Sequence, residues 1–161
     1  MSLPAPACLY LATSLDNTPA TLAALLSHLP AGDIAWETRP DPDRFSLREI
    51  VAHLADWEAV WRERFERILN EEKPLLLRPD ISQRSEEKGY ADADPQECLT
   101  RFAEGRSTLT AWLRALPPDA WGRLATLDRM GEMPLEALAS LALGHDSYHL
   151  RQVTEWRAAD Q

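Results

Sequence analysis

Apolar residues recur along most of the chain at intervals of three or four positions, and this spacing predicts four long helices. The first helix lies within residues 7–29, and its apolar positions include Leu22, Leu25, Leu26 and Leu29. Thr18 and Pro19 leave two alternatives open, because Pro19 either occupies the first turn of a new helix or kinks a longer one. The segment 30–33, which contains Pro30 and Gly32, ends this helix.

The second helix has the clearest start. Ser46 and Glu49 have the spacing of a capping box, and Phe45 with Ile50 can form the accompanying hydrophobic staple. The helix is expected to end near Leu69. Its apolar face is formed by Ile50, Leu54, Trp57, Trp61, Phe65 and Ile68.

Two further helices follow in the second half of the chain. Asp94, Pro95 and Glu97 provide an N-cap, a first-turn proline and an acidic third position, so a helix is expected from there to Leu116. Another is expected from about Pro134 to about Ala158.

Signals for β-strands are almost absent, since no apolar–polar alternation extends over five positions. The segment 73–93 is charged and contains Pro74, Pro79 and Gly89, so it is interpreted as a long loop. Four long helices and little else predict a single all-α domain over residues 1–161, a four-helix bundle. The long connections 30–45 and 73–93 leave the direction of each helix open.

Charge and composition exclude several classes of function. The 161-residue chain has 17 Lys and Arg against 26 Asp and Glu, a net charge of −9, which disfavours binding to nucleic acid or to an anionic membrane surface. It has neither an apolar run long enough to span a bilayer nor a basic signal-peptide start, so a cytoplasmic location is expected. Cys8 and Cys98 match no metal or redox spacing and are expected to be buried, reduced thiols.

The final helix carries the residues with the most specific chemistry. His145 and His149 are four positions apart, so their side chains lie one above the other and can reach one metal ion. They belong to a stripe that is apolar at both ends and is formed by Leu138, Leu141, Ala142, His145, His149, Gln152 and Trp156. Unpaired burial of these polar groups would cost several kcal/mol, which a bound metal would offset.

His53 is the candidate third ligand, because it flanks the apolar face of the second helix and can face the other two histidines. Three imidazoles with an open position form the ligand set of a catalytic zinc site, although imidazole also suits Ni, Cu and Fe. The alternative is that the histidines are satisfied within the core. The remaining histidine, His28, is interpreted as a residue that favours a helix C-terminus.

Polar residues near these histidines have two interpretations each. Glu49 and Asp56 lie one turn from His53 and either orient its ring or lie on a solvated face. Gln152 either bonds a water held at the metal or makes an ordinary hydrogen bond at the edge of the core.

Arginine and tryptophan residues could contribute to substrate binding. Arg101, Arg106 and Arg129 either reach an anionic substrate group or form surface salt bridges. Trp57, Trp61 and Trp156 either wall an apolar pocket beside the metal or simply fill the core. The sequence contains no phosphate-binding loop and no recognisable nucleophile. It also lacks the HExxH motif and paired Glu-x-x-His motifs.

Two segments together resemble a known family. The first reads SLREIVAHLADWE and contains His53, and the second reads GHDSYHLRQV and contains His145, His149 and Gln152. With Thr18–Pro19, Trp36 and the Gly131–Pro134 entry to the last helix, they resemble the DinB/YfiT-like superfamily of candidate metalloenzymes, in its DinB_2-type branch. The resemblance implies an up-down-down-up bundle whose long crossover joins the second and third helices. It also implies a homodimer and a divalent metal, Zn or Ni, held by His53, His145 and His149.

Relatives in this family imply a thiol-dependent S-transferase that uses a low-molecular-weight thiol and acts on small electrophiles. Two alternatives stay open: a metal-dependent hydrolase with water as its nucleophile, and a non-catalytic, stress-linked protein that binds a metal or ligand. The expected partner is a small-molecule substrate. The sequence assigns no catalytic acid or base.

Overall fold

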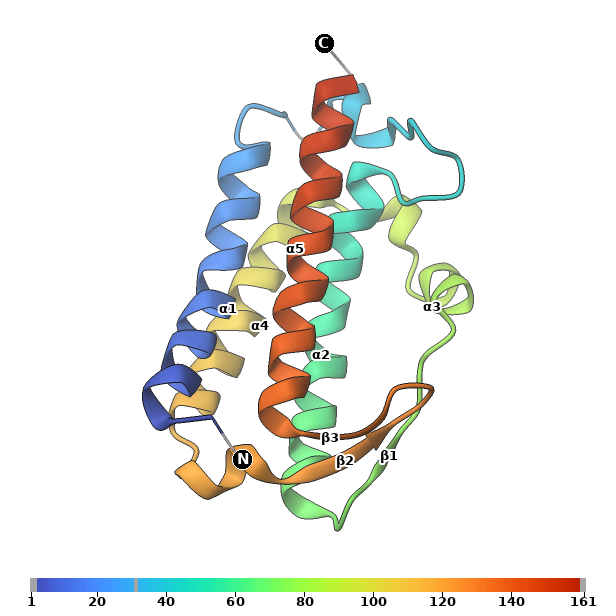
Figure 1. Ribbon diagram of the computed structural model, residues 1–161. Coiled ribbons are helices and arrows are strands. Elements are labelled where there is room, and N and C mark those ends of the chain that lie inside the picture. The colour runs from blue at the N-terminus through green and yellow to red at the C-terminus, as the bar shows by residue number, and fades with distance from the viewer. Residues whose placement is uncertain (1–2, 31, 160–161) are drawn as a thin grey trace.

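The structure is a computed structural model that describes residues 3–30 and 32–159. Four long helices lie side by side and confirm the predicted four-helix bundle (Figure 1). They are α1 (Ala5–Leu26), α2 (Leu47–Asn70), α4 (Pro95–Arg114) and α5 (Leu135–Ala159).

The arrangement of these helices settles the direction of each one. Helices α1 and α2 both pack against α4 and α5, so they occupy diagonal positions in the bundle. The colour gradient shows that α1 and α5 run one way and that α2 and α4 run the other (Figure 1). The up-down-down-up topology is therefore confirmed, and the segment between α2 and α4 returns along the outside of the bundle.

The predicted caps are present at the helix starts. The Ser46 hydroxyl accepts from the Glu49 backbone N–H at 3.3 Å, and the Glu49 carboxylate accepts from the Ser46 N–H at 2.8 Å. Asp94 caps α4 by accepting from two backbone N–H groups. Helix α4 ends two residues before the predicted Leu116. The backbone N–H groups of Ala115 and Leu116 donate to the carbonyls three residues earlier, which is the pattern of a 3₁₀ turn and not of an α-helix.

Helix α1 runs through Pro19 without interruption, so Thr18 and Pro19 do not begin a new helix. Proline has no backbone N–H, which frees the carbonyl four residues earlier from its helical hydrogen bond. That carbonyl belongs to Leu15, and it accepts a hydrogen bond from the Arg106 guanidinium at 2.9 Å. The proline thus leaves a backbone acceptor for a side chain from another helix.

The interpretation of residues 73–93 as a loop is wrong in part. This segment contains a two-residue strand β1 (Leu75–Leu76), a short helix α3 (Ile81–Glu87) and a 3₁₀ turn (Tyr90–Asp92). Strand β1 pairs in parallel with β2 (Leu124–Leu127), which pairs antiparallel with β3 (Gly131–Pro134). No strand exceeds four residues in the described chain, so none could show an alternation over five positions.

The bundle core is built largely on α2, whose buried side chains include Ile50, Trp57, Trp61 and Phe65. Cys8 and Cys98 are buried free thiols, as predicted. In the described part of the chain, the helices all lack the length and apolarity that crossing a membrane requires.

Candidate metal centre and cleft

The three predicted histidines lie together between α2 and α5. Nε2 of His53 is 2.8 Å from Nε2 of His145, and the three ring centroids are 4.7–5.0 Å apart. Candidate ligand nitrogens of His53, His145 and His149 all lie within 4.8 Å of one another. This juxtaposition arises because α2 and α5 are antiparallel neighbours, which brings the start of α2 beside the middle of α5.

Gln152 fixes the protonation of His149. Its side-chain amide donates to the Phe45 carbonyl at 3.2 Å, so its oxygen faces Nδ1 of His149 at 3.1 Å. A carbonyl oxygen can only accept, and Nδ1 must therefore carry the proton. In a neutral imidazole this leaves the Nε2 lone pair free, which is the state a metal ligand requires.

Burial keeps two of the histidines uncharged. Burial, followed by the nearby His149, His145 and Arg84, lowers the pKa of His53 to about 2. Burial and the nearby His145 lower the pKa of His149 to about 3. Both rings are consequently neutral at physiological pH and present lone pairs rather than positive charges.

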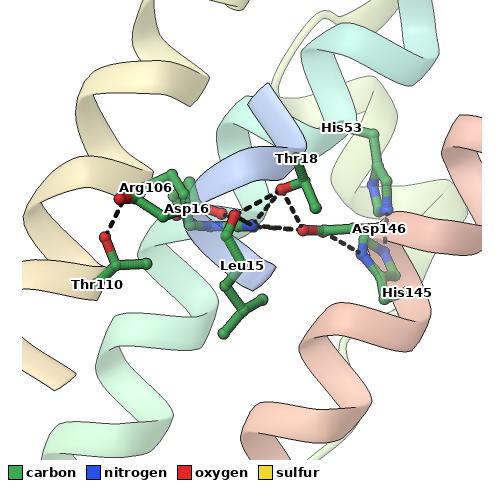
Figure 2. Close-up of polar contacts among 9 residues, drawn as sticks. Leu15, Asp16, Thr18, His53, Arg106, Thr110, His145 and Asp146 are labelled. Carbon is green, nitrogen blue, oxygen red and sulfur yellow. Dashed lines mark hydrogen bonds and ion pairs between the residues drawn. The ribbon is translucent and has the colours of Figure 1, made fainter. Parts of the chain in front are cut away.

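The Nδ1 atoms of His53 and His145 face away from the histidine group and differ in their surroundings. Nδ1 of His53 and Nδ1 of His145 are buried without a hydrogen-bond partner among the described residues. A carboxylate oxygen of Asp146 nevertheless lies 3.7 Å from Nδ1 of His145. Figure 2 marks this contact with a dashed line. A carboxylate behind an imidazole favours the tautomer whose other nitrogen faces the metal.

Arg106 lies at the centre of a buried charge network that joins α1, α2, α4 and α5 (Figure 2). Its guanidinium donates to both carboxylate oxygens of Glu58, at 2.6 and 3.0 Å, and pairs with Asp146. It also donates to the Leu15 carbonyl and, at 2.6 Å, to the Thr18 hydroxyl. The network thereby holds Asp146 in place behind His145.

A glycine allows α4 to approach α2 at this network. A Cβ atom at Gly105 would lie 3.1 Å from both Cβ and Cγ of Glu58. Such a contact is tighter than ordinary van der Waals packing, so a larger residue would require Glu58 to shift by a few tenths of an ångström.

The histidines open onto a cleft of about 930 Å³. Trp57 and Trp61 line it beside His145, at ring-centroid distances of 5.7 Å each. The segment 42–45, helix α3 and the turn between β2 and β3 supply its other walls. A volume of this size is typical of sites for small molecules, and the histidine group is accessible to a ligand.

Comparison with known proteins identifies the family. A model described as the DinB superfamily matches residues 14–153. The chain belongs to the DinB superfamily. It is 31% identical over 142 residues to YfiT of Bacillus subtilis (strain 168), named as a candidate metal-dependent hydrolase, and the match covers 88% of this chain and 79% of that protein.

A solved structure of YfiT from Bacillus subtilis matches the DinB fold seen here with a TM-score of 0.88 and 26% sequence identity. The match covers 98% of this chain and 90% of the YfiT chain. That structure is described as a candidate metal-dependent hydrolase with an unusual four-helix bundle topology. The shared topology is the up-down-down-up order of the DinB domain in Figure 1.

Glu49 and Asp56, which either orient His53 or lie on a solvated face in the sequence-based interpretation, contact other partners in this DinB domain. Glu49 is committed to the capping box and to an ion pair with Arg39 at 2.5 Å. Asp56 pairs with Arg84 and accepts from the Tyr90 hydroxyl at 2.6 Å. Both carboxylates are therefore engaged by partners other than His53.

Other predicted residues take different places. Arg106 is neither a surface residue nor a substrate contact, because the buried network uses its guanidinium fully. Arg101 is exposed and does not line the cleft, whereas Arg129 lines it from the β2–β3 turn. Trp156 is buried outside the cleft, where its indole donates to the Phe45 carbonyl and packs against Arg44.

The neutral histidines predict a pH dependence of stability for the metal-free DinB domain. Their native pKa values lie below the unfolded value of about 6.5, so on acidification the unfolded state binds protons first and stability is lost. The free energy of unfolding, measured by urea denaturation, should fall by about 2 kcal/mol between pH 6.5 and pH 5.5 through His53 and His149 together.

A His149→Ala variant provides the control for this pH effect, because it removes one of the two groups. Its unfolding free energy should fall by about 1 kcal/mol less over the same interval. Equal slopes for the two proteins would contradict the neutral, buried state of His149.

Proposed function

We propose that this DinB-family protein is a metal-dependent enzyme in which His53, His145 and His149 hold a divalent ion. The observation that carries the proposal is the convergence of three imidazoles, two of them buried and neutral, at a cleft open to small molecules. Three nitrogen ligands with an open position suit zinc, and nickel is the other expected ion. The histidines provide the three ligands and the cleft provides the open position.

When bound, such an ion supplies Lewis acidity that lowers the pKa of a nucleophile beside it. The chain's own residues prepare the position. Gln152 holds His149 in the tautomer with a free Nε2, and Asp146 stands behind His145. Trp57 and Trp61 keep one wall of the cleft apolar, which suits an apolar part of a substrate.

We propose hydrolysis, with water as the nucleophile, as the first reaction. Its support is the 31% identical YfiT, whose name describes a candidate metal-dependent hydrolase. In this reaction the water oxygen bonds to an acyl or related electrophilic centre, the bond to the leaving group breaks, and the leaving group departs with the electron pair of that bond. One water proton goes to the leaving group or solvent, and the other stays on the new acid or passes to solvent.

Thiol-dependent S-transfer is the second candidate. The cleft volume of about 930 Å³ lies near the upper end for small-molecule sites, which leaves room for a thiol beside an electrophile. In that reaction the thiol sulfur bonds to the electrophilic carbon, the leaving group departs with the electron pair of its bond, and the thiol proton passes to solvent.

Turnover by the zinc- or nickel-loaded protein tests both reactions. The assay would follow 4-nitrophenyl acetate and 1-chloro-2,4-dinitrobenzene, each with and without cysteine or glutathione, against the metal-free protein. Metal-dependent turnover without thiol supports hydrolysis, and metal-dependent turnover only with thiol supports S-transfer. Tight metal retention without turnover of any substrate in a broader panel of esters, amides and alkyl halides would overturn the enzyme proposal in favour of a non-catalytic metal or ligand binder.

A further inference from the structure

The charge of the cleft differs from that of the whole chain. The protein carries a net charge of −9, yet five arginines and four acidic residues line the cleft. Two of these arginines are neutralised by carboxylates, Arg39 by Glu49 and Arg44 by Glu155 at 3.1 Å. A third, Arg129, lies 3.9 Å from a carboxylate oxygen of Asp128, which leaves Arg64 and Arg78.

Arg64 is the buried member of this group. Only 8% of the residue is exposed, and its guanidinium lies 5.4 Å from the centroid of the Trp61 ring. One N–H donates to the Leu77 carbonyl at 3.1 Å, out of the five that a guanidinium carries. Within the described chain no carboxylate lies at ion-pair distance from it, and the exposed Glu63 is the negative charge that acts on it from further away.

Two other arginines with low exposure have carboxylate partners. Arg106 is held between Glu58 and Asp146, and Arg84 is paired with Asp56. An unpaired buried charge is costly, and burial lowers the pKa of Arg64 accordingly. The nitrogens of Arg64 are not among the sealed, unpartnered atoms of the described residues, and the residue lines the cleft as well as a smaller neighbouring cavity. An arginine in this state is suited to a bidentate contact with an incoming anion.

Arg64 is placed in line with the histidine group. His53, Trp57, Trp61 and Arg64 follow one another at helical spacing on α2, and all four line the cleft. Eleven residues of helix correspond to about 16 Å along the axis, and a long side chain leans back toward the helix N-terminus. The Arg64 guanidinium lies 5.4 Å from the Trp61 ring centroid, and that centroid lies 5.7 Å from the His145 ring. A small molecule that lies along the Trp61 wall can therefore reach from the guanidinium toward the histidines.

We propose that Arg64 forms an anion-binding subsite of the cleft, which receives a carboxylate or phosphate group at the end of the substrate remote from the histidines. This inference rests on the proposed function for the identity of the reacting end. Arg78 is a further arginine that lines the same cleft. The preferred substrates are thus small molecules with an anionic group at one end and the electrophilic centre at the other.

Binding to the metal-free protein tests the subsite separately from catalysis. Benzoate and phenyl phosphate serve as anionic probes and benzamide as the neutral counterpart of benzoate, at low salt and neutral pH. The Trp61 indole N–H resonance in ¹H–¹⁵N spectra reports binding beside Arg64. We expect Arg64→Gln to weaken binding of both anions about 10-fold or more. Benzamide should bind the native protein about as weakly as benzoate binds the Arg64→Gln variant.

Matched variants make the outcome decisive. Arg62→Gln removes an exposed arginine two residues away, which is paired with Glu66, and should leave the dissociation constants unchanged. If Arg64→Gln fails to fold by circular dichroism, Arg64→Lys takes its place and should weaken benzoate binding several-fold by removing the planar fork. Tighter binding of one anion than of the other identifies the group that the subsite prefers.

Three results would overturn the subsite: equal binding of benzoate and benzamide, unchanged binding after the Arg64 substitution, or no saturable binding of either anion. None of them involves metal or turnover, so each is distinguishable from a failure of the proposed enzymatic activity. In a protein with activity, Arg64→Gln should raise KM for 4-acetoxybenzoate about 10-fold relative to phenyl acetate, with kcat nearly unchanged.

Discussion

Replacing His149 by alanine is expected to weaken zinc binding more than about 100-fold, since loss of a group that only supports a metal ligand already costs 10–100-fold. His149 is one of the three proposed ligands, and Gln152 already holds it in the tautomer that binds a metal. Competition against a chromophoric chelator gives the affinity. Elemental mass spectrometry of the tag-free protein gives the metal content, expected to be near one ion per native chain.

His28→Ala is the matched control for this substitution. His28 is the fourth histidine of the chain, is exposed, and lies just beyond the end of α1. Its removal should leave zinc affinity unchanged, whereas Gln152→Leu should weaken it by about 10- to 100-fold because Nδ1 of His149 loses its acceptor. Unchanged zinc affinity in His149→Ala would sink the proposed ligand set, since the remaining two histidines cannot account for a site with three.

Much of the bundle could be predicted from local signals. The capping box at Ser46, the Asp94 cap and the periodic apolar residues depend on neighbours within one or two helical turns. The candidate metal site follows from similar reasoning, because the i, i+4 histidines lie on a stripe that must face the core. His53 required one further assumption, that the second and last helices are neighbours, and the structure confirms it.

Contacts between distant segments could not be predicted in the same way. Strand β1 exists because Leu75 and Leu76 pair with residues about fifty positions later, and two residues carry no periodicity of their own. The homodimer and the cytoplasmic location implied by sequence and resemblance stay predictions.

The sequence-based interpretation of Arg106 as a surface or substrate-binding residue is wrong for a related reason. Its partners Glu58 and Asp146 lie 48 and 40 residues away, and an isolated arginine on a helix is ordinarily solvated. One signal could have placed it correctly, because Phe102, Arg106, Leu109 and Leu113 share a helical stripe that is otherwise apolar. A charge at the centre of such a stripe requires buried counterions, as the in-stripe histidines require a ligand.

Arg106→Met is expected to destabilise the protein by about 3–5 kcal/mol, because it leaves the Glu58 and Asp146 carboxylates buried without their cation. Urea denaturation measures the loss. Arg114→Met, on the same helix, removes a half-exposed ion pair with Asp16 and should cost no more than about 1 kcal/mol. Equal losses in the two variants would show that the Arg106 charge contributes no more than a surface pair.

The pH dependence of the Arg106→Met defect separates lost charge from lost packing. Carboxylates left unpaired in the interior have raised native pKa values, so the variant takes up protons on folding and recovers stability as pH falls. Its deficit relative to the native protein should therefore shrink from pH 7 toward pH 5, whereas a packing defect would be independent of pH. Because Asp146 also stands 3.7 Å behind His145, the variant should bind zinc about 10- to 100-fold more weakly, which links the buried charge network to the metal centre.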